Sequence, residues 1–194
     1  MYSINEVTIS ELVIKNSRFI TLLFPLNNKS NIIDILDNVK HQYPKATHYC
    51  YAYITSDTQK SSDDGEPSST AGVPMLNVLL KKNIVNVLAV TVRYFGGIKL
   101  GAGGLVRAYT KSVTTALANT KLTFMEKALE IEIYIDYSSQ KMLENILNQS
   151  KILEKEFTDK IRYVAIIPIN IKEKLTTYNF KILSENKYLE KTEY

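Results

Sequence analysis

The sequence is poor in cysteine and has no long apolar run. Its 194 residues include one cysteine, Cys50, so an internal disulfide and a structural zinc site made of several thiolates are both excluded. No apolar run approaches the roughly 20 residues that a membrane-spanning helix needs. The segment Met1–Glu6 lacks the basic and apolar stretches of a signal peptide. We therefore expect a cytoplasmic protein with no membrane partner.

Composition and charge place the chain among ordinary globular proteins. Apolar residues make up 45% and charged residues 23%, and the length suffices for one large or two small domains. The net charge of +4 is uneven, because residues 1–125 carry 13 lysines and arginines against 8 acidic residues, whereas residues 126–194 carry 11 against 12. This basic surplus is compatible with a polyanionic partner, but many proteins that bind no nucleic acid have as much.

Glycine is absent from most of the chain. All seven glycines lie between Gly65 and Gly104, so the backbone conformations that favour glycine are confined to one central block. In this first part we expect strands at 19–26, 48–55 and 84–92 and helices at 30–43, 74–82 and 104–119, with Ser30 or Asn31 as the first N-cap. Residues 55–70 carry no large apolar side chain, which predicts a long loop.

The glycine-free second part predicts a β-α-β-β-α-β order. Residues 129–137 alternate between apolar and polar side chains, as in a strand with one wet face. A helix from residue 138, strands at 152–158 and 161–171, a helix at 172–184 and a strand at 187–192 complete the order. This order over about seventy residues suggests a ferredoxin-like domain. We expect an α/β (α+β) protein with domains at residues 1–124 and 125–194.

An acidic loop holds the first candidate site. Asp63, Asp64 and Glu66 fall within four positions and supply the oxygen ligands that Mg2+ and Ca2+ take, although no EF-hand spacing is present. The same carboxylates are compatible with a general base, and His48 is compatible with acid–base catalysis near pH 7. The alternative is a solvated acidic turn, with His48 as a structural side chain.

The glycine-rich block Arg93–Gly104 is the stronger candidate. A loop of small residues that enters a helix N-terminus exposes backbone N–H groups and the positive end of the helix dipole, which favour an anion. Arg93, Lys99 and Arg107 bring positive charge to the same region. Neither the Walker phosphate-loop pattern nor the dinucleotide-binding glycine pattern is present. The alternative is a tight structural turn that packs a strand against a helix.

Side chains next to these loops allow further interpretations. Tyr94 and Phe95, beside Arg93, are compatible with a stacking platform for bases, because aromatic and cationic side chains together bind single-stranded nucleic acid. Such a pair is also typical of a core at the end of a strand. Cys50 lies between tyrosines in a predicted strand, so we interpret it as a buried apolar filler and not as a nucleophile.

At these residues the sequence resembles the IMPACT/YigZ family. The resemblance rests on motifs that occur in order: Ser17-Arg18-Phe19, Ala46-Thr47-His48, Ser62–Pro67 with Thr70–Pro74, and Arg93–Gly101 with Gly103–Tyr109. It covers most of residues 1–120, and residues 125–194 resemble the C-terminal domain of the bacterial members. It implies an N-terminal domain with a ribosomal-protein-like α/β fold, similar to a late domain of elongation factor G, followed by a ferredoxin-like domain.

The resemblance also points to translation. It implies a partner there, since the eukaryotic relatives modulate an initiation-factor kinase pathway through a protein, and nucleic-acid or ribosome binding is the usual proposal for bacterial members. The family has no established catalytic residues, and we expect no cofactor. The predicted binding residues, taken from the motif positions and their chemistry, are Arg18, Arg93, Tyr94, Phe95, Gly96, Gly97, Lys99, Gly103, Gly104 and Arg107.

Three functional hypotheses follow. The leading one is a non-enzymatic, translation-associated protein that binds RNA or the ribosome through a basic cleft between the acidic and glycine-rich loops. The second is an enzyme that acts on a phosphate-bearing substrate, with His48, Asp64 and Glu66 as catalytic candidates and Asp63, Asp64 and Glu66 as metal candidates. The third is a protein-interaction module that regulates translation.

Overall fold

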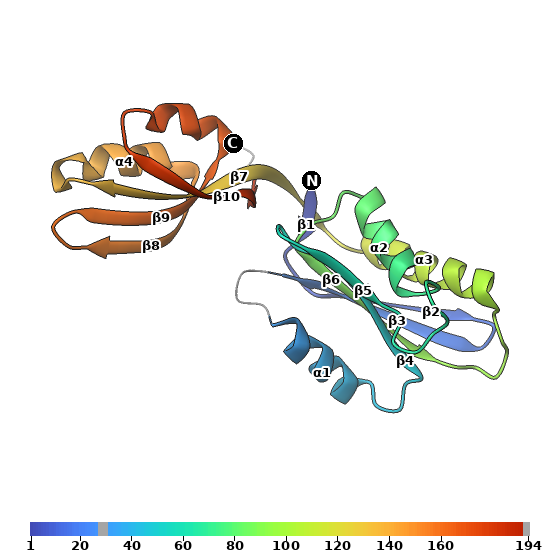
Figure 1. Cartoon of the computed structure of the whole chain (residues 1–194). Helices are drawn as coiled ribbons and strands as arrows, with labels where there is room; N and C mark the ends of the chain where they lie inside the picture. The colour runs from blue at the N-terminus through green and yellow to red at the C-terminus, as the bar shows by residue number, and fades with distance from the viewer. Residues whose placement is uncertain (27–30, 192–194) are drawn as a thin grey trace. The chain divides into compact units, whose positions relative to one another are not determined.

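The structure is a computed structural model in which residues 1–26 and 31–191 are described. The chain divides into two compact units, Met1–Thr123 and Phe124–Tyr194. Helices pack against an antiparallel sheet in each unit (Figure 1). The α/β fold class predicted from the sequence is therefore confirmed. Among the described residues, no helix is long and apolar enough to cross a membrane.

The first unit contains a five-stranded antiparallel sheet of order β2-β3-β6-β4-β5. The central strand, β6, is buried from Val87 to Val92, which explains its nearly continuous apolar sequence. The elements of this unit are β1 (Tyr2–Ile4), β2 (Thr8–Ile14), β3 (Ser17–Pro25), α1 (Ile32–Gln42), β4 (His48–Ile54), β5 (Gln59–Ser62), α2 (Gly72–Lys81), β6 (Val87–Tyr94) and α3 (Ala102–Ala118).

Helices cover both faces of this sheet. Figure 1 shows α1 on one side and α2 with α3 on the other. The amphipathic helix α1 buries Val39 against apolar side chains of β3 and β6. Its N-cap is Asn31, whose side chain accepts a hydrogen bond from the N–H of Ile33 at 3.1 Å. Ser30, the other predicted cap, lies outside the described residues.

The predicted loop at residues 55–70 is in part a strand. β5 pairs antiparallel with β4, so that Ser62 lies opposite Tyr51. No apolar pattern marks this strand, because backbone hydrogen bonds hold an edge strand and it needs no apolar face. The rest of the segment folds inward, since Glu66 and Thr70 are both buried.

The second unit follows the predicted β-α-β-β-α-β order, with a 3-10 helix in the second helical position. Its strands pair antiparallel in the order β10-β7-β9-β8. The alternating apolar side chains of β7, among them Ile131 and Ile133, lie in the core as predicted. The elements are β7 (Leu122–Ile135), η1 (Tyr137–Ser139), α4 (Gln140–Ile146), η2 (Leu147–Gln149), β8 (Lys151–Phe157), β9 (Ile161–Pro168), η3 (Ile169–Leu175) and β10 (Phe180–Glu190).

The helix predicted at residues 172–184 is wrong. The helical segment η3 ends at Leu175, and β10 begins at Phe180. Phe180 and Ile182 pair with Ile133 and Ile131 of β7 and pack against the core, which a strand achieves with its alternating side chains. The strand predicted at 187–192 is the later part of β10, and its last residue, 192, lies outside the described residues.

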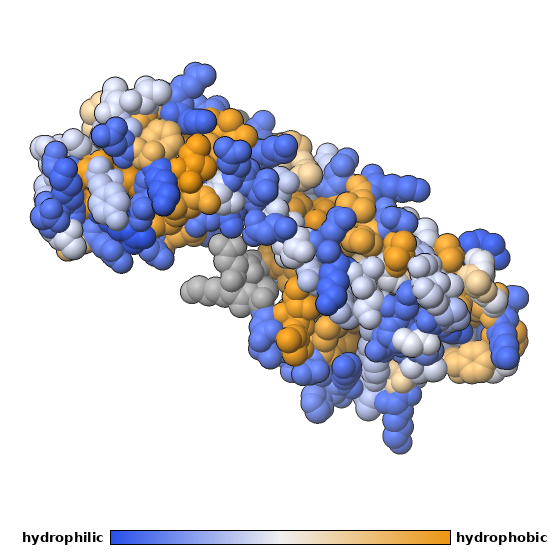
Figure 2. Space-filling model, in the orientation of Figure 1, coloured by the Kyte–Doolittle hydropathy of each residue, from blue (hydrophilic) through white to orange (hydrophobic). Residues whose placement is uncertain are grey.

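Both hydrophilic and apolar side chains reach the surface. Figure 2 shows hydrophilic side chains over much of the visible face, with apolar side chains gathered between them. On the first unit, Ile9 and Val13 of the edge strand β2 are 52% and 63% exposed. We did not predict this strand, although exposed and half-buried positions alternate along it.

Candidate functional site

Most of the predicted site residues lie at one end of the first sheet. β6 ends at Tyr94, where the glycine-rich loop leaves the sheet. The strand register places Arg18 opposite Tyr94 and His48 opposite Arg93. β5 ends at Ser62, opposite Tyr51 in the middle of β4, and the acidic loop follows it toward the start of β4. The fold therefore brings motifs that are far apart in the sequence to the same end of the sheet.

Arg93 and Glu66 form a buried ion pair at this end. Arg93 is 5% exposed, and its Nη1 donates to Oε1 of Glu66 at 2.5 Å. The hydroxyl of Tyr109 donates to the same oxygen at 2.8 Å. The guanidinium also lies 5.4 and 5.5 Å from the ring centroids of Phe19 and Phe95. Because an unpaired buried charge is very costly, each member of the pair needs the other.

A thiol belongs to the same buried cluster. Cys50 Sγ lies 2.9 Å from the backbone oxygen of Asp63 and 3.3 Å from Oη of Tyr109. Burial is the main cause that raises the pKa of the Cys50 thiol to about 12, and burial also raises the pKa of Tyr109. Cys50 is therefore protonated at neutral pH, which agrees with its interpretation as a buried filler and not as a nucleophile.

Asp63 organises the acidic loop through backbone hydrogen bonds. Its Oδ2 accepts from the N–H of Ser69 at 2.8 Å, and its Oδ1 accepts from the N–H groups of Ala71 and Gly72 at 2.9 and 2.8 Å. Burial opposes the charge of this carboxylate, but the three N–H donors outweigh it and lower the pKa of Asp63. The carboxylate thus fixes the loop and the start of α2.

Asp64 and His48 make a second set of contacts within the loop. Oδ2 of Asp64 accepts the backbone N–H of Tyr49 at 2.6 Å, and Nδ1 of His48 lies 2.8 Å from the backbone oxygen of Asp64. A carbonyl oxygen only accepts, so Nδ1 donates, and Nε2 faces Oε2 of Glu66 at 3.8 Å. The 3.8 Å between His48 and Glu66 is longer than the roughly 2.6–3.2 Å of a catalytic hydrogen bond, and Glu66 is already paired with Arg93.

The structure does not bring the three acidic side chains together as a metal site. Asp63 and Asp64 accept backbone N–H groups in different parts of the loop, and Glu66 turns inward to its arginine. Within residues 1–26 and 31–191, no group of three or more His, Cys, Asp or Glu side chains is placed to hold a metal ion. A solvated acidic turn does not describe Glu66 either, because this residue is buried.

Gly96 and Gly97 shape the loop that leaves β6. The N–H of Gly96 donates to Oγ of Ser17 at 3.1 Å, and a Cβ on Gly96 would lie 2.1 Å from the backbone carbonyl carbon of Asn16. Gly97 has φ +83° with no heavy atom within 4 Å of an added Cβ, so its conformation and not its space favours glycine. The tight structural turn therefore accounts for both glycines.

The N-terminus of α3 is positively charged and open. Its N-cap is Gly101, and the first turn has neither a capping side chain nor an acidic residue. Gly103 and Gly104 lie in that turn, and Nη1 of Arg107 is 3.6 Å from the place of a Cβ on Gly103. Lys99 and Arg107 are exposed, with no ion-pair partner in the described part of the chain. This arrangement favours an anion.

The structure differs from the prediction for the other two cations. Arg93 is buried against Glu66, so its guanidinium is not available to a phosphate. Arg18 is exposed, but Glu11 accepts from its Nε and Nη2 at 2.7 and 3.1 Å. The Arg18 guanidinium also lies 5.4 Å from the centroid of the Tyr94 ring. The charge of Arg18 is thus compensated by a neighbour, unlike the charges at the start of α3.

The two predicted stacking rings have different surroundings. Tyr94 is half-buried, and its hydroxyl donates to the backbone oxygen of Pro44 at 3.2 Å. Phe95 is 46% exposed, and its backbone N–H donates to Oγ1 of Thr47 at 3.0 Å. Phe95 is therefore the ring that a base is able to reach.

Two residues of this region were not singled out from the sequence. Tyr109 lies within the helix predicted at residues 104–119, but helical periodicity gives no sign that its hydroxyl reaches Glu66. Glu11 lies on the strand β2, where it pairs with Arg18, and the alternation of that segment was the only signal that pointed to a strand.

Comparisons with known proteins agree on one family. Residues 15–117 match the Impact N-terminal domain. The chain is 42% identical over 158 residues to the IMPACT family member YvyE of Bacillus subtilis, with 80% of this chain and 73% of the relative covered. It is 37% identical over 151 residues to the IMPACT family member YigZ of Escherichia coli, with 74% of each covered. A crystal structure of a hypothetical protein is similar over 94% of this chain and 96% of its own, with a TM-score of 0.69 and 29% identity. The chain therefore belongs to the IMPACT family.

Proposed function

We propose that this protein is a non-enzymatic, translation-associated protein that binds RNA or the ribosome through one surface of its first unit. This glycine-loop surface comprises Phe95, Gly97, Lys99, Gly103, Gly104 and Arg107. The observation that carries the proposal is the pair of exposed cations, Lys99 and Arg107, at a helix N-terminus whose first turn has no acidic residue. In the described part of the chain neither cation has an ion-pair partner.

The electrostatics of the glycine-loop surface suit a phosphate backbone. Free N–H groups at the start of α3 and the positive end of its dipole attract an anion, and Arg107 lies over the same turn. The surplus of positive charge in residues 1–125 supports the same partner class over a longer range. Because each neutralised phosphate releases counterions, we expect the association to weaken steeply as salt is added.

Phe95 adds a contact that a purely ionic surface lacks. Its ring lies over the buried guanidinium of Arg93, at 5.5 Å, while the side chain remains 46% exposed. The ion pair between Arg93 and Glu66 thereby supports the ring from the protein side. A base that stacks on an exposed ring contributes roughly 1–3 kcal/mol with little sequence preference. This contact fits a partner with single-stranded segments.

The enzyme hypothesis receives less support. A general base needs a lone pair that faces a substrate, but Glu66 is buried between Arg93 and Tyr109. Asp63 and Asp64 are engaged by backbone N–H groups of their own loop. These contacts favour a structural role for the acidic loop, which fixes the start of α2.

Co-sedimentation of the purified full chain with ribosomes and with total RNA, at low and high salt, tests the proposal. A double variant, Lys99→Ala with Arg107→Ala, removes the two unpaired cations. We expect salt-sensitive association for the natural protein and at least a tenfold loss for the variant, because two charge-assisted phosphate contacts disappear.

The matched control is Lys81→Ala with Lys82→Ala, which removes the same charge from exposed positions at the end of α2. We expect this control to change the association only slightly. No association of the natural protein at low salt overturns the proposal, and equal losses in both variants overturn the assignment of the surface. Association that ignores both salt and the variants favours a protein-interaction module.

A further inference from the structure

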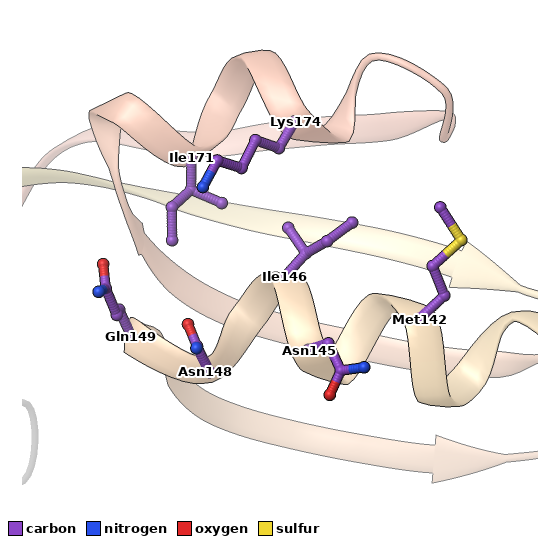
Figure 3. Close-up of a pocket in the computed structure, with 7 residues that line it drawn as sticks. All are labelled: Met142, Asn145, Ile146, Asn148, Gln149, Ile171 and Lys174. Atoms are coloured by element: carbon purple, nitrogen blue, oxygen red, sulfur yellow. The ribbon is translucent and has the colours of Figure 1, made fainter.

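The second unit has a groove on its helical side, between α4–η2 and η3. Its volume is about 360 Å3, within the range of roughly 300–1,000 Å3 that is usual for small-molecule sites. Figure 3 shows its walls, with α4 and η2 on one side and η3 on the other. The residues that line it are Met142, Asn145, Ile146, Asn148, Gln149, Ile171 and Lys174.

The polar side chains of the groove are Asn145, Asn148, Gln149 and Lys174. Figure 3 shows the carboxamides of Asn148 and Gln149 on the side that faces η3, and the amine of Lys174 extended toward them, while Asn145 points away. In the part of the chain that the structure describes, no hydrogen bond or ion pair reaches the side chains of Asn148, Gln149 and Lys174. No Asp or Glu is among the lining residues. The groove thus offers a cation together with free donors and acceptors.

Apolar side chains supply the rest of the groove. Ile171 of η3 is 3% exposed and belongs to the core of the unit, and Ile146 of α4 packs partly buried against the same core. Met142 is 61% exposed at the other end of the lining. A flat apolar face is therefore able to lie against Ile146, with the carboxamides at its edge.

We infer that this groove binds one nucleotide of the bound RNA, an inference that rests on the proposed function and adds a second contact to it. A carboxamide donates and accepts side by side, and this is the pattern that pairs with the edge of a nucleobase. Asn148 and Gln149 read the base edge, Ile146 contacts its face, and Lys174 binds the phosphate. An anion without a base would use Lys174 alone.

A single-nucleotide site also fits the charge of this part of the chain. Residues 126–194 carry 11 basic and 12 acidic residues, which gives no general attraction for a polyanion. One phosphate contact depends weakly on salt, with a slope of roughly −0.7 in the logarithm of the binding constant for single strands. Nucleotide binding here is expected to persist at salt concentrations that release RNA from the glycine-loop surface.

Titration of the full chain with AMP, GMP, CMP and UMP, followed by backbone amide NMR, tests the inference. We expect shift changes in α4, η2 and η3 for at least one nucleotide, with about tenfold weaker binding at this groove in Lys174→Ala and a similar loss for the corresponding nucleoside. Lys172→Ala is the matched control, because Lys172 is exposed on the same 3-10 helix and does not line the groove.

Three results overturn the inference: no shift with any nucleotide, equal effects of both lysine variants, or inorganic phosphate that reproduces the shifts of the nucleotides. Any of these together with intact, salt-sensitive ribosome association removes the groove and leaves the proposed function in place. Absence of ribosome and RNA association in the natural protein instead overturns the proposed function, whether or not the nucleotides bind. The two failures are thus distinguishable.

Discussion

The acidic loop and the glycine-rich loop leave the same end of one sheet, but their charged residues face in opposite directions. Asp63 and Glu66 turn inward and accept hydrogen bonds from the backbone and from Arg93. Lys99 and Arg107 turn outward and have no ion-pair partner in the described chain. The density of charge in a loop therefore does not tell whether the loop binds a ligand or holds the fold together.

Backbone hydrogen bonding explains the difference. The acidic loop runs back across the sheet end to α2, so its inward N–H groups need acceptors, and Asp63 serves three of them. The glycine-rich loop lies outside, and the first N–H groups of α3 have no side-chain cap. The carboxylates thus satisfy the fold, whereas the start of α3 is left for water or for an anion.

The largest expected effect on stability comes from a substitution in the acidic loop. Glu66→Ala leaves the Arg93 guanidinium buried without its partner, and we expect the free energy of unfolding to fall by about 3–5 kcal/mol. Urea unfolding measures this loss. Lys99→Ala in the glycine-rich loop serves as the control, and we expect it to change the free energy of unfolding by no more than about 0.5 kcal/mol. Equal effects of the two substitutions would contradict the contrast between the loops.

The pH dependence of stability gives a smaller effect in the same loop. Because the folded pKa of Asp63 lies below its usual value of about 3.9, its stabilisation is present above that value and is lost as the pH falls through the folded pKa. Asp63→Asn is expected to cost roughly 1.5–3 kcal/mol at pH 7, from weakened hydrogen bonds to a charged group. The difference from the natural protein should shrink below pH 4 in urea titrations, and a constant difference down to pH 2 would refute this role.

Much of the fold was predictable because it depends on patterns along the chain. The alternation around Ile131 and Ile133 predicted a strand face that lies in the core, and Asn31 caps its helix by a local hydrogen bond. The inward turn of Glu66 was not predictable, because its partner Arg93 is distant in the sequence and the two meet only through the pairing of β4 with both β5 and β6. Phe180 was misassigned to a helix for the same reason, since pairing with β7 outweighed the local pattern.

The glycines also differ in whether the fold requires them: Gly96 packs tightly against the backbone, whereas Gly103 has space for a larger side chain. A Cβ on Gly96 would lie 2.1 Å from the backbone of Asn16, so Gly96→Ala forces β3 and the loop apart. We expect a loss of about 1–3 kcal/mol in urea unfolding, as for other overpacked sites. Unchanged stability would mean that the loop moves freely away from the sheet end, and the support of Phe95 by Arg93 would then be in doubt.

Gly103→Ala has the smallest expected effect on stability and tests most directly whether the start of α3 contacts a ligand. An added Cβ would lie 3.6 Å from Nη1 of Arg107, an ordinary contact with the end of a flexible side chain. Alanine also favours a helix over glycine, so we expect stability to be unchanged or to rise by up to about 1 kcal/mol. The fold therefore does not require glycine here, and the remaining physical reason is close approach of a ligand to the backbone. Weaker ribosome co-sedimentation by a protein of equal or higher stability is the expected result, and unchanged co-sedimentation would remove the start of α3 from the glycine-loop surface.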